Sequence, residues 1–341
     1  MSKKNSSVLN LKKSLSKNKK IFQIYSDFKG HLKKSRKKKF IIGVSGGSDS
    51  LALAAFSKFY QIEKKVKVFY VLIDHSIRKN SAKEALKIKK FLKKYKISLK
   101  ILKNRNKIIS NVQSKARSIR YDLLLNYCKK KNADCILTAH HSDDQIETFL
   151  IRLSRGSGIQ GLSSMKTKTK LNKKVTLLRP LLDQKKKDLE YVSKRIFGKF
   201  FFDPSNSDTK YLRIRIRNLK KSFEKSGIHH DQIIQTIKNL NSSSETLNAY
   251  IQTIFKKNVK KSKSKILINF KKISIETIEI QLKIFSQAIQ LFSNTYYPPR
   301  AKKVIYIINQ FKEKEPKSLT LSKCIFKKLG NYIVITKEVK K

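Results

Sequence analysis

The chain has 341 residues and carries 80 Lys and Arg against 23 Asp and Glu, which gives a formal net charge of +57 at pH 7. A charge of this size favours a polyanion such as nucleic acid as a partner, although the codon bias of an AT-rich genome would also raise the lysine content. No apolar run approaches the ~20 residues that cross a bilayer, and the N-terminus lacks the apolar core of a signal peptide, so we expect a cytoplasmic protein without a membrane partner.

Residues 1–39 hold fourteen basic side chains and one acid, Asp27. This composition predicts a basic N-terminal arm, with a short amphipathic helix around the apolar segment 21–28. From residue 40 onwards, short apolar runs alternate with helical patterns, as in strands buried between two helical layers. The runs that predict strands are 40–44, 66–74, 97–102, 134–139 and 175–178, and the helical patterns are 49–60, 81–95, 112–131 and 143–155. The alternation predicts an α/β fold with a doubly wound, parallel, five-stranded sheet.

After Pro180 the alternation stops, and a helical pattern covers residues 210–226. The following stretch, 229–311, reads as mainly helical apart from one strand at 265–270. Two further strands, 324–327 and 332–336, flank a turn and predict a terminal hairpin. We therefore expect a larger domain over residues 40–215 and a smaller, mainly helical α+β domain over 216–341.

A glycine-rich loop follows the first predicted strand, where ligands bind at the carboxyl edge of an open parallel sheet. Two adjacent glycines allow backbone N–H groups to converge, and the helix that begins near Asp49 adds its positive end, so the loop resembles a phosphate cradle. It matches neither GxxxxGK[ST] nor GxGxxG. A tight turn with Ser48 or Asp49 as helix N-cap is the structural alternative. The loop residues expected to contact phosphate are Ser45, Gly46, Gly47, Ser48 and Ser50.

Asp49 is unusual for a phosphate site because a carboxylate repels phosphate unless a cation lies between them. It therefore implies Mg²⁺ shared with a pyrophosphate group. A second carboxylate is expected where strand 134–139 ends beside the loop, and Asp144 is the predicted partner ligand, with Asp143 next to it. A capping box formed by Ser142 and Gln145 is the alternative role for this segment.

Four further side chains, Asp74, His75, Arg117 and His140, are predicted to meet the nucleotide. Asp74 and His75 end the second strand, where an adenine and its ribose would lie. Arg117 shares a helix face with Arg120, and the scarcity of acids favours phosphates over acidic side chains as the partners of this pair. His140 leaves the fourth strand, where it would serve either as a proton acceptor or as a hydrogen-bond donor to phosphate.

Several stretches give the chain a family resemblance. The motif SGGSDS resembles the pyrophosphate loop of the N-type ATP pyrophosphatases, the PP-loop superfamily of adenine nucleotide alpha hydrolase-like fold. Other stretches, in family order, resemble the bacterial tRNA(Ile)-lysidine synthetases. They are DHSIR at 74–78, ARSIRY at 116–121, TAHHSDDQIETFLIRLSRGSGIQGL at 138–162, RPLL at 179–182 and DPSNSDTKYLRIRIR at 203–217. Ser76 stands where the family usually has glycine, and Ile214 stands where it usually has asparagine.

The resemblance implies ATP-dependent ligation of L-lysine to the wobble cytidine of the CAU-anticodon isoleucine tRNA, through an adenylated cytidine, with release of AMP and pyrophosphate. It implies ATP and Mg²⁺ as cofactors, with Asp49 and Asp144 as metal ligands and Asp49, His140, Asp143 and Asp144 as catalytic residues. Residues 40–215 would then be the PP-loop ATP-binding domain, and residues 216–341 would bind tRNA. Both a monomer and a homodimer remain open.

Two alternatives remain open at this point. One is another AMP-forming PP-loop enzyme, such as a tRNA thiolase, and the other is a non-catalytic RNA-binding protein. The three cysteines, Cys128, Cys135 and Cys324, form no CxxC pair and are odd in number, which argues against disulfides, zinc or iron–sulfur sites, and thiol chemistry.

Overall fold

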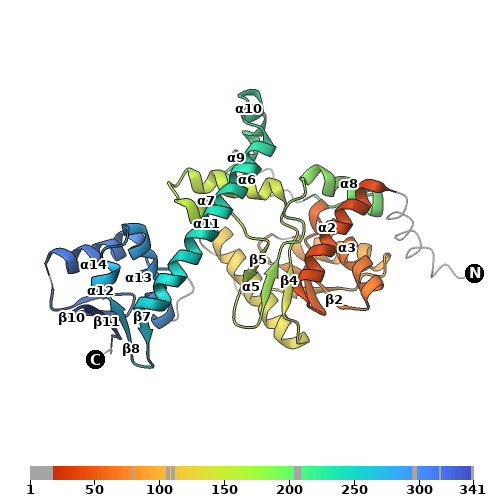
Figure 1. Cartoon of the computed structure of the whole chain (residues 1–341). Coiled ribbons are helices and arrows are strands. Elements are labelled where there is room, and N and C mark those ends of the chain that lie inside the picture. The colour runs from red at the N-terminus through yellow and green to blue at the C-terminus, as the bar shows by residue number, and fades with distance from the viewer. Residues whose placement is uncertain are drawn as a thin grey trace, which may run out of the picture. The chain divides into compact units, whose positions relative to one another are not determined.

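The computed structural model describes residues 18–78, 80–104, 108, 112–202, 209–293, 298–314 and 316–338. The chain divides into two compact units, residues 1–240 and 241–341 (Figure 1). Each unit has its own sheet and its own hydrophobic core. No helix in the described part of the chain is both long enough and apolar enough to cross a membrane.

The sheet of the first unit has six strands among the described residues, in the order β3-β2-β1-β4-β6-β5. Five of them are parallel and confirm the predicted strands, whereas β5 is a short antiparallel edge strand that the sequence analysis missed. The strands are β1 (Lys39–Gly43), β2 (Lys67–Asp74), β3 (Leu99–Lys103), β4 (Cys135–Leu137), β5 (Lys168–Lys170) and β6 (Thr176–Leu178).

Helices cover both faces of this sheet. In β1, Phe40 and Ile42 point into a core formed with α2, α3, α4 and α8, whereas Ile41 points into a second core formed with α5. Side chains alternate along a strand, so burial on both faces makes the run continuously apolar, and the doubly wound α/β fold is confirmed. The helices are α2 (Lys19–Ser35), α3 (Ser48–Lys64), α4 (Ser81–Lys93), α5 (Val112–Lys131), α6 (Ser142–Leu153), α7 (Ile159–Leu162), α8 (Lys186–Phe197), α9 (Leu212–Asn218), α10 (Lys220–Lys225) and α11 (His230–Asn258).

The segment predicted as a basic N-terminal arm contains a helix that packs on the first unit. Asn18 caps α2, a helix that is longer than expected and that buries one apolar face in the core of the first unit. Its buried residues are Ile21, Ile24, Tyr25, Phe28 and Leu32. The first unit therefore includes this helix and does not begin at residue 40, whereas residues 1–17 lie outside the described residues.

The second unit contains an antiparallel sheet in the order β7-β8-β11-β10-β9, packed against helices. The predicted strand at 265–270 and the terminal hairpin are confirmed, but the unit holds more strand than a mainly helical domain would. The short strands β7 and β9 were missed. Its elements are β7 (Val259–Lys261), β8 (Lys265–Asn269), α12 (Phe270–Ile273), α13 (Ile278–Ser293), α14 (Ala301–Glu313), β9 (Leu319–Leu321), β10 (Cys324–Leu329) and β11 (Tyr332–Lys337).

The division between the units lies within α11 and comes later than the expected boundary at 215/216. The reason is that α9, which spans the expected boundary, packs as a whole on α6 of the first unit. Ile214 and Ile216 of α9 are both buried. Ile214 occupies the position where the resembled family has asparagine, and here it serves the core.

Candidate active site

The loop between β1 and α3 is held together by one hydroxyl group. Ser50 Oγ accepts hydrogen bonds from the N–H groups of Ser45 at 3.1 Å and Gly46 at 3.0 Å, and it donates to the carbonyl of Gly47 at 3.0 Å. Ser50 is buried in the first turn of α3. The loop is thus a preformed structure whose shape depends on its own residues.

The two glycines of the loop have different roles. Gly46 has φ +92°, and a Cβ there would lie 2.5 Å from Cδ1 of Ile88, so a side chain is excluded both by backbone conformation and by space. Gly47 is the N-cap of α3, with φ −69° and no side-chain cap. The expected alternative, a cap by Ser48 or Asp49, is therefore wrong. Instead, Ser48 Oγ donates to Asp49 Oδ1 at 3.0 Å.

The N-terminus of α6 places a histidine in the site that the sequence analysis did not select. His141 is the N-cap of this helix: its N–H donates to Asp144 Oδ2 at 3.1 Å, and its Nδ1 accepts from the Asp144 N–H at 3.4 Å. The capping box is formed by His141 and Asp144, one residue earlier in the chain than the alternative box of Ser142 and Gln145. Gln145 instead donates to the carbonyl of Met165.

Two carboxylates from different helices converge on this histidine. Asp49 Oδ2 and Asp144 Oδ2 each lie 3.5 Å from His141 Nε2, so the two oxygens are no farther apart than twice that distance. Burial lowers the pKa of His141, but the hydrogen bond to Asp49 and the charges of Asp144 and Asp49 outweigh burial and raise it above its ordinary value. The site therefore stabilises positive charge at the point where the two carboxylates meet.

This arrangement fits Mg²⁺. The described residues contain no group of three or more His, Cys, Asp or Glu side chains arranged to hold a metal by themselves. Mg²⁺ commonly binds through one or two carboxylates together with substrate phosphates, rather than in a cage made only of protein ligands. Asp49 and Asp144, beside the glycine loop, are such a pair.

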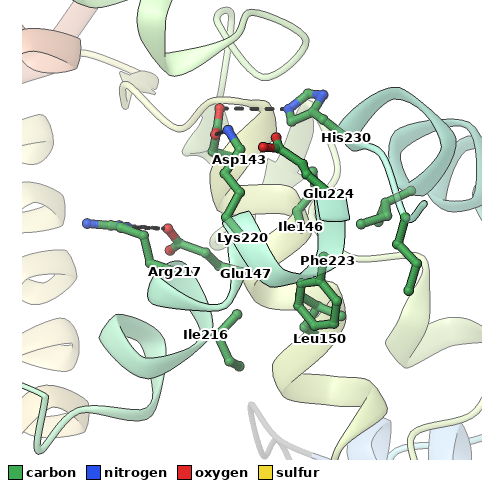
Figure 2. A pocket seen from close by; sticks show the side chains of 12 residues that line it. Asp143, Ile146, Glu147, Leu150, Ile216, Arg217, Lys220, Phe223, Glu224 and His230 are labelled. Atoms are coloured by element: carbon green, nitrogen blue, oxygen red, sulfur yellow. Dashed lines mark hydrogen bonds and ion pairs between the residues drawn. The ribbon is translucent and has the colours of Figure 1, made fainter. Parts of the chain in front are cut away.

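Asp143 makes different contacts from its neighbour Asp144. Asp143 Oδ2 accepts from the N–H of Lys186 at 3.0 Å. Its Oδ1 accepts from Lys220 Nζ at 3.1 Å (Figure 2). Burial raises the pKa of Asp143, but the hydrogen bond from Lys186 and the charge of Lys220 hold it below its ordinary value. Both oxygens of Asp143 thus already have partners on other helices.

His140 precedes the capping residue, and its ring Nδ1 lies 2.9 Å from the Thr138 hydroxyl. Burial lowers the pKa of His140 to about 3, and the charge of Asp144 offsets this only in part. The guanidinium groups of Arg179 and Arg117 add to the decrease. His140 is therefore neutral at pH 7 and a weak base, which favours hydrogen bonding over proton transfer.

The end of β2 places Asp74 and His75 as expected. Asp74 is buried, and its Oδ1 accepts from the N–H of Ser76 at 2.9 Å. Ser76 has φ +53°, so the position that is usually glycine in the resembled family keeps a left-handed backbone here. Both ring nitrogens of His75 are buried, and neither has a hydrogen-bond partner among the residues that the structure describes. Burial and the charge of Arg120 lower the pKa of His75. An unpartnered, neutral imidazole is suited to a polar ligand such as a nucleoside.

Arg117 is exposed on α5, and its guanidinium lies 5.2 Å from the centre of the Tyr121 ring. A guanidinium group offers planar N–H donors that match the geometry of a phosphate group. Since the charge of Arg117 also lowers the pKa of His140, the two residues belong to the same electrostatic environment.

A buried carboxylate on α6 was missed by the sequence analysis. Glu147 is 4% exposed, and its Oε1 accepts from Arg217 at 2.7 Å, while Oε2 lies 3.3 Å from Arg213 Nε. Arg213 and Arg217, four residues apart on α9, therefore share one helix face and one partner. The signal was present, because Glu147 follows Asp144 by three residues and so lies on the same side of the helix.

Comparisons with known proteins show the family and the fold of this chain. A family model described as a PP-loop domain matches residues 16–221. A tRNA(Ile)-lysidine synthase of Wolbachia pipientis wMel is 34% identical over 302 residues, covering 87% of this chain and 70% of the relative. Another, of Rickettsia bellii (strain OSU 85-389), is 31% identical over 314 residues, covering 88% and 70%. A solved U34-tRNA thiolase of Methanococcus maripaludis has a TM-score of 0.55 at 19% identity, covering 65% of this chain and 79% of that chain, which supports the fold alone.

Proposed function

The chain belongs to the tRNA(Ile)-lysidine synthase family of PP-loop proteins, and from this membership we infer that it is an ATP-using enzyme that forms lysidine on tRNA(Ile). We propose further that the modified base is the wobble cytidine of the CAU anticodon and that L-lysine supplies the amine. The cytidine would be adenylated first, with release of pyrophosphate, and the amine would then displace AMP.

The observation that carries the proposal is the convergence of Asp49 and Asp144 on one nitrogen of His141 beside the glycine loop. We propose that these carboxylates hold Mg²⁺, which neutralises pyrophosphate charge when bound. Asp49 follows the loop that would hold the β and γ phosphates, whereas Asp144 comes from the neighbouring strand-to-helix connection. The ion would therefore lie between the leaving group and the rest of the site.

The remaining residues are assigned to the nucleotide. Gly46, Gly47 and the hydroxyl groups of Ser45 and Ser48 would contact the phosphates, with Ser50 holding the loop in shape. The unpartnered nitrogens of His75, next to the buried Asp74, would meet the adenosine. His140 and Arg117 would bind the α-phosphate region through N–H donors. Of the two roles first considered for His140, its low pKa supports the hydrogen-bonding one.

The tRNA is the larger ligand, and we propose that the second unit contributes to its binding. Support comes from the net charge of +57, because each phosphate neutralised by Lys or Arg releases counterions and adds affinity that does not depend on base sequence. This term brings the RNA to the protein, whereas the choice of base depends on the active site.

Thiol chemistry finds no support in the structure. Cys128, Cys135 and Cys324 are all buried free thiols. Burial raises the pKa of Cys128 to about 12 and that of Cys135 to about 12, so neither forms the thiolate that sulfur transfer would need. The fold that the chain shares with a tRNA thiolase therefore does not extend to the thiolase reaction.

The test is to incubate the purified protein with ATP, Mg²⁺, isotope-labelled lysine and a CAU-anticodon tRNA. We expect label in the RNA and an equal amount of AMP. Asp144→Asn should abolish both, whereas Asp183→Asn, which removes an exposed carboxylate, should change neither. AMP formation without lysine in the RNA would indicate another acceptor, and RNA binding without AMP would refute the enzymatic proposal.

A further inference from the structure

The first residues of three other helices contact the side chain of Asp143, which lies in the first turn of α6. Its neighbour Ser142 is the first residue of α6, and its three other partners are the first residues of α8, α10 and α11. These are Lys186, Lys220 and His230, which lie 3.0, 3.1 and 3.8 Å from the Asp143 oxygens. Figure 2 shows Lys220 and His230 beside Asp143. A carboxylate at helix N-termini is stabilised by their positive ends. Segments far apart in the chain thus meet where α6 begins.

His230 makes the most specific of these contacts. Its Nδ1 lies 3.0 Å from Asp231 Oδ1, and because a carboxylate only accepts hydrogen bonds, Nδ1 carries a proton. The other nitrogen, Nε2, lies 3.1 Å from Ser142 Oγ, so in the neutral ring the serine hydroxyl donates to it. Asp231 in turn pairs with Lys185 at 2.7 Å. The ring is therefore fixed on both edges, and 12% of the side chain is exposed.

The Ser142 hydroxyl that His230 holds is part of the first turn of the active-site helix. Ser142 is buried, and its N–H donates to the carbonyl of Gln184 at 2.9 Å, so both its polar groups are anchored outside α6. On either side of Ser142 along this turn stand His141 and Asp144, whose positions relative to Asp49 define the proposed magnesium site. A shift of this turn would move both residues together.

We propose that His230 is a positioning residue for the magnesium and nucleotide site. It contacts neither Asp49 nor Asp144, and it acts through Ser142 by setting where the first turn of α6 lies. The inference rests on the proposed function, because it assigns a purpose to the position of Asp144 opposite the phosphate loop. It adds a residue of α11, a helix that continues to Asn258, beyond the division between the units.

The test measures binding rather than turnover. The affinity of a non-hydrolysable ATP analogue is measured by calorimetry in Mg²⁺ and in EDTA for the unaltered protein and for His230→Ala. We expect the variant to bind about tenfold more weakly in Mg²⁺, the loss associated with misplacing one charged hydrogen-bonding ligand. In EDTA the change should be less than about twofold, because the phosphate loop is untouched.

Two substitutions at the same position separate positioning from bulk stability. Gln places its amide where Nε2 stands and can meet Ser142, so His230→Gln should restore most of the affinity in Mg²⁺. Asn is shorter and can meet only Asp231, so His230→Asn should behave like the alanine variant. This pair carries the test if His230→Ala does not fold. His229→Ala, which changes an exposed histidine next to it, is the matched control.

The outcomes are distinguishable. Equal affinities of the unaltered and His230→Asn proteins in Mg²⁺ would overturn the inference and leave the proposed reaction intact. Equal losses in Mg²⁺ and in EDTA, with Gln no better than Asn, would show a general structural role and would also overturn it. An unaltered protein whose affinity is insensitive to Mg²⁺ would remove the proposed magnesium site and this inference with it.

Discussion

Gly46 and Gly47 are adjacent in the phosphate loop but differ in what an added methyl group would meet. At Gly46, with φ +92°, an alanine is strained by ~1–3 kcal/mol from its backbone alone. Its Cβ would also lie 2.5 Å from Cδ1 of Ile88, and overpacking of this kind costs a further ~1–3 kcal/mol. At Gly47, with φ −69°, the nearest atom is Ser45 Oγ at 3.9 Å, so an alanine fits.

We therefore expect Gly46→Ala to reduce the free energy of unfolding by ~2–6 kcal/mol and the melting temperature by roughly 10 °C. Gly47→Ala should change the free energy of unfolding by less than ~1 kcal/mol. It should nevertheless weaken ATP binding at least tenfold, since the new methyl group occupies space through which phosphate would reach the loop. Chemical denaturation followed by circular dichroism and calorimetric titration with an ATP analogue measure the two effects.

A second substitution tests whether the contact with Ile88 contributes. Ile88→Val removes Cδ1, so Gly46→Ala should be ~1 kcal/mol less damaging in the valine background than in the unaltered chain. The strain from φ would remain. If Gly46→Ala unfolded at the same denaturant concentration as the unaltered protein, or if Gly47→Ala were equally destabilised, the assignment of a structural role to one glycine and a ligand role to the other would be wrong.

Three further outcomes are expected in the active site. Asp49→Asn and Asp144→Asn should each slow AMP formation about 100-fold in single-turnover assays. The double variant should be little slower than either single variant, because two ligands of one ion act as a unit. Losses that add up in the double variant would show that the two carboxylates act independently. His140→Gln should slow the reaction without changing the shape of its pH–rate profile between pH 6 and 9, because a group with a pKa of about 3 is already neutral there. If the rate of the unaltered protein fell below about pH 6.5 and that of the variant did not, this expectation would be wrong. The pKa of Asp143 in the folded protein lies below its ordinary value of 3.8, which applies in the unfolded chain. Between these two pKa values the native state binds fewer protons than the unfolded state, so the stability that Asp143 contributes is lost as the pH falls through its folded-state pKa. Thermal unfolding between pH 5 and pH 3 should therefore show a smaller decrease for Asp143→Asn than for the unaltered protein.

The central sheet could be predicted because strands buried on both faces appear in the sequence as uninterrupted apolar runs. The three strands that were missed have only three residues each. Lys168–Lys170 is polar and lies at an edge of its sheet, and Val259–Lys261 and Leu319–Leu321 form the two edges of the other sheet. An edge strand pairs on one side only, and so short a segment carries no hydrophobic period that would distinguish it from a loop.

The approach of Asp49 to Asp144 could also be expected, because parallel strands bring their carboxyl ends to one edge of the sheet. The division of roles between Asp143 and Asp144 could not. It depends on Lys186, Lys220 and His230, which are separated from Asp143 by 43 residues or more along the chain. Local spacing likewise suggested Ser142 as the N-cap, but in the folded protein its hydroxyl lies beside His230, and His141 takes the cap position.

The ligands proposed for this enzyme place opposite electrostatic demands on it. A chain with 80 basic and 23 acidic residues attracts RNA, but the same field repels Mg²⁺. The active site gathers acidic groups locally, because Asp49, Asp143 and Asp144 all lie within 3.9 Å of a ring nitrogen of His141. Screening limits the reach of exposed charges to ~8 Å at physiological salt, so carboxylates gathered here would attract the proposed Mg²⁺ without weakening the attraction for RNA farther away. The chain has few acids, yet the fold brings three carboxylates to one imidazole. Asp49 comes from the connection between β1 and α3, and Asp143 and Asp144 come from the connection between β4 and α6.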